Sequence, residues 1–260
     1  MATHDYVIDN STGANVRADI NNVLQAILSN NSSGSSPSTT VAYMLWADTT
    51  NNLLKIRNTA NSDWITLRGL DGSLTSSADA SINSVAVGKG ANSVAGNTVL
   101  GENALDASVT GANNVAIGKN ALTEGTSVHN SVAIGSAAAD ANTSGSNFVA
   151  VGYGTLSANT TGSSNTALGV SALNANTTAS NNTAVGDSAL STNTTAADNT
   201  AVGKHSLKLN TTGVENVAVG SNALDANTTG KRNVAIGHDC LSSNTTADFN
   251  IAIGRSCMAT

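Results

Sequence analysis

The sequence predicts a mainly β fold: a parallel β-solenoid of seventeen-residue coils, preceded by a small α+β module. The first supporting observation is a glycine that recurs every seventeen residues from Gly101 to Gly254, with no insertion. The second is the short run of the type Val-Ala-Ile that precedes most of these glycines. The third is composition, because only 11% of the 260 residues are charged, against about 25% in a compact globular protein. Disorder is a poorer interpretation, since disordered chains are usually rich in proline and this chain has one, Pro37.

Residues 1–75 do not repeat and are expected to form a separate α+β module. Residues 16–28 predict an amphipathic helix, because their apolar residues recur at helical spacing. A segment rich in serine, asparagine and glycine, residues 30–40, is expected to be a loop. Three short antiparallel strands are then expected within residues 41–67. The apolar face of the helix would consist of Val16, Ile20, Val23, Leu24 and Ile27.

Residues 76–260 are expected to form the solenoid, with one three-residue strand before each glycine. Alternate residues of a strand point to opposite faces, so the β-branched pair would share one face and the alanine would occupy the other. Helix fits less well, since β-branched residues and a glycine recur in every unit. We expect the β-branched residues, and the leucine four positions after the glycine, to stack into core columns. The expected core residues are Val115, Ile117, Leu122, Val185, Leu190, Val202, Leu207, Val219, Leu224, Ile236 and Leu241.

Seven residues after the glycine, most units carry an asparagine followed by threonine, as at Asn176 and Asn193. Asparagine tolerates left-handed backbone and bonds to nearby backbone groups, so these positions are expected to form a corner. Identical asparagines on successive coils can also form amide ladders. A single coil cannot bury a core, but coils stacked about 4.8 Å apart can. The alanine-bearing or the leucine-bearing face is expected to pack against other copies, most simply in a parallel homotrimer.

Two phrases of the repeat resemble known families. The Asn-Val-Ala-Ile-Gly phrase at residues 114–118 and 233–237 resembles the head repeats of trimeric autotransporter adhesins. That family forms a trimeric parallel β-roll from shorter units. The longer phrase at residues 216–229, with Ala-Leu and Asn-Thr-Thr, resembles repeats that are common in bacteriophage tail fibres. The likeness covers residues from about 84 to the end and implies a trimeric rod.

The phrases LWADTTNNLLKIRN (residues 45–58) and DWITL (residues 63–67) resemble the N-terminal module of phage tail fibres, notably those of marine and cyanobacterial podoviruses. The resemblance implies that residues 1–75 attach the fibre to adaptor or nozzle proteins of the tail. MATHD, the first five residues, lacks the basic start and apolar core of a signal peptide. This agrees with assembly in the host cytoplasm and localisation in the virion. The residues expected in the attachment are Tyr6, Val16, Ile20, Leu24, Trp46 and Trp64.

No catalytic residue, metal site or cofactor is expected. The net charge of −6 does not favour binding to nucleic acid, which needs a basic surface. The apolar run 41–47 is too short to cross a membrane. Glycoside cleavage would need paired carboxylates about 5–10 Å apart, whereas the acidic residues of the rod are scattered. The cluster His238-Asp239-Cys240 is not expected to bind metal, because His238 follows the glycine at a variable position and is expected to be solvated. Ice binding is disfavoured, because the threonines are adjacent and do not share one face.

The two cysteines, Cys240 and Cys257, occupy the same repeat position and would stack on adjacent coils. A disulfide is conceivable there, but a reducing compartment and parallel side-chain vectors favour two buried thiols.

The sequence thus indicates a non-enzymatic tail fibre that projects a trimeric rod toward the host surface for adsorption. Its outer, C-terminal end is expected to contact a host receptor or a distal tip protein. Two alternatives remain open: a structural spacer onto which a separate receptor-binding protein docks, and a fragment of a bacterial trimeric adhesin, which would need an export signal and a membrane anchor.

Overall fold

The structure is a computed structural model that describes residues 32–36, 44–69, 80–82, 85–107 and 109–258. The chain divides into two compact units, Met1–Ser77 and Ala78–Thr260, and each is described by itself. The expected helix at 16–28 and the expected attachment residues Tyr6, Val16, Ile20 and Leu24 lie outside the described residues.

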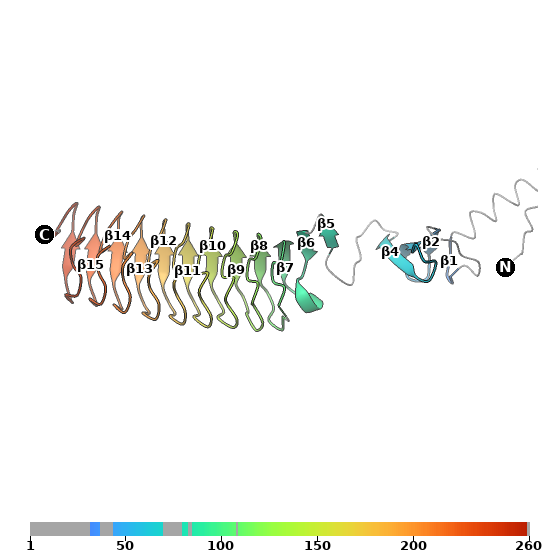
Figure 1. The fold of residues 1–260 in the computed structure, drawn as a ribbon, viewed down its shortest axis with the longest axis horizontal. Helices are drawn as coiled ribbons and strands as arrows, with labels where there is room; N and C mark the ends of the chain where they lie inside the picture. The colour runs from blue at the N-terminus through green and yellow to red at the C-terminus, as the bar shows by residue number, and fades with distance from the viewer. Residues whose placement is uncertain (1–31, 37–43, 70–79, 83–84, 108, 259–260) are drawn as a thin grey trace, which may run out of the picture. The chain divides into compact units, whose positions relative to one another are not determined.

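The described part of the first unit is a four-stranded sheet in the order β1-β2-β3-β4 (Figure 1). The expected antiparallel meander is confirmed, since β2, β3 and β4 pair antiparallel in sequence order. β1 pairs parallel to β2 and comes from a segment expected to be a loop. The strands are β1 (Ser32–Ser33), β2 (Leu45–Asp48), β3 (Leu53–Arg57) and β4 (Trp64–Gly69).

One face of this sheet holds a small core around two tryptophans. Trp46 is buried, and its ring centroid lies 5.1 Å from that of Trp64. The Lys55 ammonium lies 4.7 Å from the Trp46 ring centroid and 2.7 Å from Asp48 Oδ2. Asn51 donates its backbone and side-chain N–H groups to the same buried carboxylate. Aromatic and ionic contacts therefore form the small core on this face of the sheet.

Within the described residues, the second unit forms one twelve-stranded sheet. It begins with two antiparallel strands and a short 3-10 turn: β5 (Ala80–Ile82), β6 (Val85–Gly88) and η1 (Ala91–Ser93). From β7 onward all pairing is parallel, and each residue pairs with the one seventeen positions away. The parallel strands are β7 (Thr98–Gly101), β8 (Val115–Ile117), β9 (Val132–Ile134), β10 (Val149–Val151), β11 (Thr166–Leu168), β12 (Thr183–Val185), β13 (Thr200–Val202), β14 (Val217–Val219), β15 (Val234–Ile236) and β16 (Ile251–Ile253).

This unit is a parallel β-solenoid with one strand in each coil, as the sequence predicts (Figure 1). Its core consists of the strand alanines, such as Ala184, together with the leucines four residues after the glycine. The expected core leucines are all buried: Leu122, Leu190, Leu207, Leu224 and Leu241.

The expectation that the β-branched strand residues fill the coil interior is wrong. The strands carry their alanine inward and their β-branched pair outward, onto the open face of the sheet. A thin coil already filled by leucine from the opposite wall has room for only a methyl group from the strand. The expected core residues that lie partly exposed are Val115, Ile117, Val185, Val202, Val219 and Ile236.

Buried asparagines run through the solenoid in two ladders. In the first, Asn159 Nδ2 donates to Asn142 Oδ1 at 2.6 Å and to the Gly162 carbonyl at 3.0 Å. Such a ladder was among the expectations, although these asparagines have no left-handed backbone and only their side-chain amides make the corner. The second ladder stands just before most of the strands, where the Asn182 backbone N–H donates to Asn165 Oδ1 at 3.0 Å. Ser131 and Phe148 take the place of the asparagine before β9 and β10. The sequence did not reveal this second ladder.

Candidate interaction surface

The strongest candidate for function is the outer face of the parallel sheet, formed by the first and third residues of the strands β8–β16. We call it the outer apolar face. Its residues are Val115, Ile117, Val132, Ile134, Val149, Val151, Thr166, Leu168, Thr183, Val185, Thr200, Val202, Val217, Val219, Val234, Ile236, Ile251 and Ile253.

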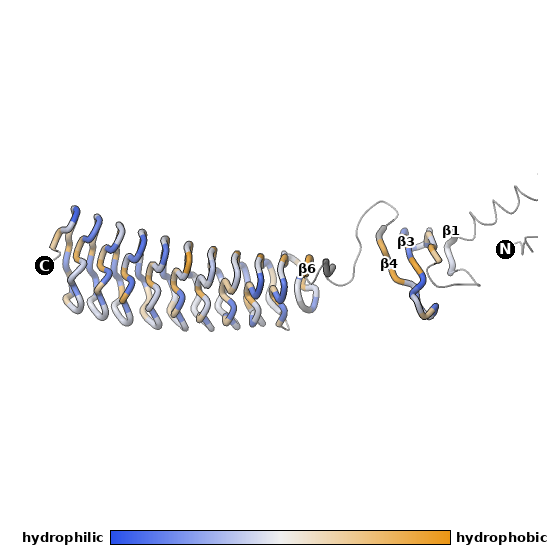
Figure 2. Tube along the Cα trace, turned by 45° about the horizontal axis from the view of Figure 1, so that its top comes forward, coloured by the Kyte–Doolittle hydropathy of each residue, from blue (hydrophilic) through white to orange (hydrophobic). Residues whose placement is uncertain are grey.

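The outer apolar face is continuous because the register is constant. Val185 pairs with Val202, and Val202 with Val219, so each residue stacks on its equivalent at about 4.8 Å. Figure 2 shows hydrophobic and hydrophilic positions recurring from coil to coil. Over nine coils the two columns extend for about 40 Å without a charged side chain.

These side chains are partly exposed in the single chain, whereas their alanine neighbours are not. Leu168 is 46% exposed and Ala167 beside it is 0% exposed. Monomeric soluble proteins rarely expose continuous apolar patches above a few hundred Å². The face therefore has the character of an interface.

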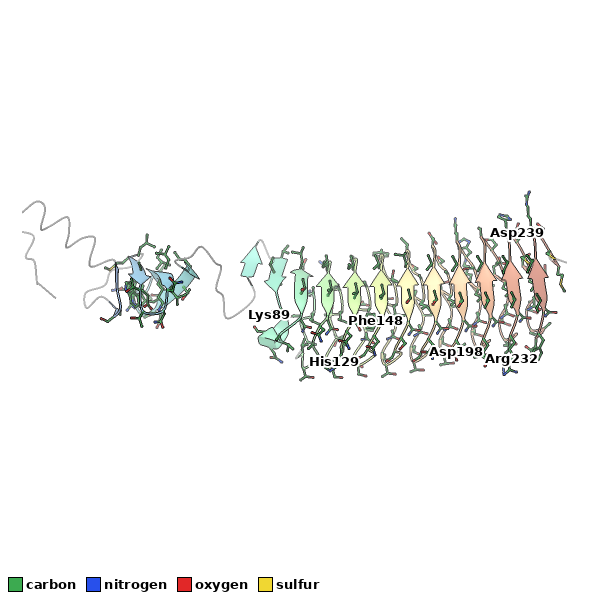
Figure 3. The ribbon with its side chains drawn as sticks, turned by 180° about the vertical axis from the view of Figure 1, so that it is seen from behind. Lys89, His129, Phe148, Asp198, Arg232 and Asp239 are labelled. Carbon is green, nitrogen blue, oxygen red and sulfur yellow. The ribbon has the colours of Figure 1, made fainter. Side chains whose placement is uncertain are left out.

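Charged side chains lie at the edges of the coils rather than on this face. In Figure 3, Asp239 is at one edge, while His129, Asp198 and Arg232 are at the opposite edge. Several ion pairs join adjacent coils, including Arg232 Nε to Glu215 Oε2 at 2.6 Å. Both partners of that pair are about half exposed, so its contribution to stability is small.

Across the residues that the structure describes, no group of three or more histidine, cysteine, aspartate or glutamate side chains is placed to hold a metal ion. His238 Nδ1 lies 2.7 Å from Asp239 Oδ2, with the histidine exposed, while Cys240 is buried. The three consecutive residues thus point to different environments.

The Asp225 carboxylate in the rod has one oxygen without a hydrogen bond, although the backbone of Asp225 and Ala226 bonds to the carboxylate. Asp225 Oδ1 is buried and makes no hydrogen bond among the described residues. Desolvation raises the pKa of Asp225, and nearby Asp239 adds to the effect. The pKa of Asp140, at the same repeat position, is also raised by desolvation. The two lie five coils apart, so they do not act as a catalytic pair.

The first unit offers a second apolar surface on the sheet face opposite the tryptophans. Leu45, Ile56 and Ile65 pair directly across β2, β3 and β4, and Leu45 and Ile65 are about half exposed. Of the expected attachment residues, Trp46 is buried, so its role within this unit is structural. Trp64 is half-buried, and its Nε1 donates to Ser36 Oγ at 2.9 Å. Burial alternates along β2, with Trp46 and Asp48 buried, but the sequence did not reveal this surface, because Leu45, Trp46 and Ala47 are all apolar.

No protein-family model, curated protein or solved structure matches this chain. In the described part of the chain, no helix has the length and hydropathy that crossing a bilayer requires. Fold and surface therefore remain the basis for assigning function: a regular parallel β-solenoid whose outer apolar face runs along nine coils without a charged residue.

Proposed function

We propose that the protein is a bacteriophage tail fibre, a non-enzymatic structural protein of the virion that acts as a homotrimer. Residues 1–75 bind adaptor or nozzle proteins of the tail. The solenoid projects toward the host surface and takes part in adsorption. Its C-terminal end contacts a host receptor or a distal tip protein.

The observation that carries this proposal is the continuous outer apolar face. An uncharged, partly exposed face about 40 Å long is best explained by burial against equal faces of other copies. Three copies around one axis cover all of these faces and leave the charged coil edges in solvent. The alanines and leucines once expected to contact other copies face the coil interior, so they take no part in this interface.

The molar mass in dilute solution tests the assembly. One chain has a mass of 25.8 kDa, and light scattering is expected to give three times that value at micromolar and nanomolar concentrations. A well-folded single subunit at all concentrations would contradict the trimer.

Adsorption of virions tests the role. Phage that carry a fibre lacking residues 76–260 are expected to retain the N-terminal module on the tail and to lose adsorption. Virions that lack the module altogether would contradict the attachment role of residues 1–75.

A structural spacer is the second candidate, favoured by the regular geometry that the coils repeat from β8 to β16. In that case a separate receptor-binding protein docks on the rod. Purified full-length fibre distinguishes the two, because a receptor-binding fibre blocks adsorption of wild-type phage when it is added in excess, whereas a spacer does not.

A further inference from the structure

The two cysteines occupy the same repeat position in neighbouring coils. Cys240 follows Gly237 by three residues, and Cys257 follows Gly254 by three. The Leu241 N–H donates to the Cys257 carbonyl at 2.8 Å, so these two segments are direct hydrogen-bonded neighbours. Equivalent Cα atoms stacked about 4.8 Å apart fall within the range of about 4.4–6.8 Å found for disulfides.

The thiol of Cys240 is directed toward the coil that carries Cys257. Its Sγ lies 3.2 Å from the carbonyl oxygen of Ala252, a residue of strand β16 in that coil. Cys240 is fully buried, while Cys257 is half-buried. Burial raises the pKa of the Cys240 thiol, and the neighbouring Cys257 adds to this. A reagent from solvent therefore reaches Cys257 first, because Cys240 is fully buried.

We propose that Cys240 and Cys257 are a disulfide-forming pair that joins the coil of β15 covalently to the coil of β16 once the protein meets an oxidising solution. The co-reactant is a small-molecule disulfide such as oxidised glutathione. The Cys257 thiolate attacks one of its sulfurs and releases the first small thiolate. Cys240 then loses its proton, attacks the Cys257 sulfur and releases the second. Two protein thiols become one disulfide, and the reagent is reduced by two electrons to two thiols.

The bond would close a loop of one coil and fix its register. Disulfides form and persist in oxidising surroundings and are kept reduced in a reducing compartment. The inference does not depend on the proposed tail-fibre role, because it uses only the solenoid register and the two side chains.

Oxidation of the folded full-length chain with oxidised glutathione tests the proposal. Titratable thiols are expected to fall from two to none per chain, with a mass loss of two hydrogens and a linked peptide in a non-reducing digest. Hydrogen exchange of the β16 amides is expected to slow at least about tenfold, with β9 unchanged. Glutathione retained on Cys257, with Cys240 still free, would overturn the proposal.

A shifted pair provides the matched control. The variant Ala223→Cys with Cys240→Ala keeps two cysteines in the same column but separates them by two coils, about 9.6 Å, which a disulfide does not span. This variant is expected to form no intramolecular disulfide. If it forms one as fast as the natural pair, oxidation takes place in an unfolded state, and the native-register pairing is refuted. The variant Cys257→Ala has at this repeat position the alanine that another coil carries at Ala223. It is expected to abolish the linked peptide.

Discussion

At the residue scale, the buried asparagines form a polar column inside a hydrophobic coil, and hydrogen bonds between them satisfy their buried amide groups. Asn193 donates to Asn176 Oδ1 at 3.2 Å and to the Ala196 carbonyl at 2.9 Å, and it accepts from Asn210 Nδ2 at 3.0 Å. Both amide N–H groups and the amide oxygen of Asn193 therefore have a partner that lies on a neighbouring coil or across the same corner. Buried amides of this kind specify register, because any slip leaves several groups unsatisfied.

The ladder yields a first prediction. Asn193→Leu removes one amide and leaves the groups on Asn176, Asn210 and Ala196 without that partner, so we expect a loss of about 3 kcal/mol in unfolding free energy. Denaturant unfolding followed by circular dichroism measures it. Thr195→Leu is the control, since Thr195 lies two residues later, is exposed and has no left-handed backbone, and we expect a change below about 0.5 kcal/mol. Equal losses of unfolding free energy in the two variants would show that the ladder does not contribute to stability.

Asp48 yields a second prediction. Its hydrogen bond from Lys55, followed by those from Asn51, lowers its pKa from 3.8 to about 2. A depressed folded-state pKa means that the stabilisation is complete above pH 3.8 and is lost as the pH falls toward about 2. Both tryptophans lie in the first unit, so their fluorescence reports its unfolding alone. Its stability is expected to drop by about 2 kcal/mol over this pH range.

Asp48→Asn is the matched variant for this titration. It removes the ionisable group, so the pH dependence between 3.8 and about 2 should flatten while the stability at neutral pH falls. An unchanged pH profile in Asp48→Asn would assign the acid sensitivity to another group.

At the element scale, the strands have three residues each, too short to be stable alone, and the coil depends on contacts between layers. The leucine after each glycine adopts left-handed backbone, as at Leu190 with φ 51°. Left-handed backbone costs a bulky residue about 1–3 kcal/mol unless its surroundings hold it there. Full burial of each leucine side chain supplies that compensation. The glycine before it is required for another reason, because a Cβ on Gly135 would collide with the Gly152 carbonyl of the next coil.

The leucine column yields a third prediction. Leu190→Asp places an unpaired charge in a fully buried position, and we expect it to cost several kcal/mol and to lower the melting temperature strongly. Differential scanning calorimetry measures the change. Thr195→Asp, five residues later on the exposed corner of the same coil, is the control and should melt like the wild type. A Leu190→Asp protein with an unchanged melting curve would refute the assignment of the column to the core.

At the scale of the whole molecule, the repeat unit stacks in constant register, so equivalent residues of successive coils form two long surfaces. One is the inner surface of alanine and leucine, and the other is the outer apolar face. The second unit has 183 residues, yet each coil contacts only its neighbours, so the stability of a solenoid is approximately a sum over coils and interfaces between them.

The outer apolar face yields a fourth prediction. Val185→Lys with Val202→Lys puts two cations on stacked positions of this face, and we expect the proposed trimer to dissociate into folded subunits. Light scattering measures the mass, and circular dichroism verifies that the β content is retained. The control is Thr195→Lys with Thr212→Lys, which has the same spacing on the exposed corner and should stay trimeric. Dissociation by both pairs would mean that net charge, not the face, controls assembly.

The sequence by itself determined the period, the strand positions and the register of the solenoid, because a strict seventeen-residue repeat of β-branched residues and glycine is compatible with little else. It also determined the antiparallel meander of the first unit, with β2 and β3 inside the expected range 41–67. Only the tertiary structure decided which face of each strand turns inward. Alternation places alanine and valine on opposite faces but does not say which is inside. Alanine faces inward because the interior of the coil is narrow. The leucine on the opposite side and the asparagine ladders fill it, so that only a methyl group fits beneath the strand.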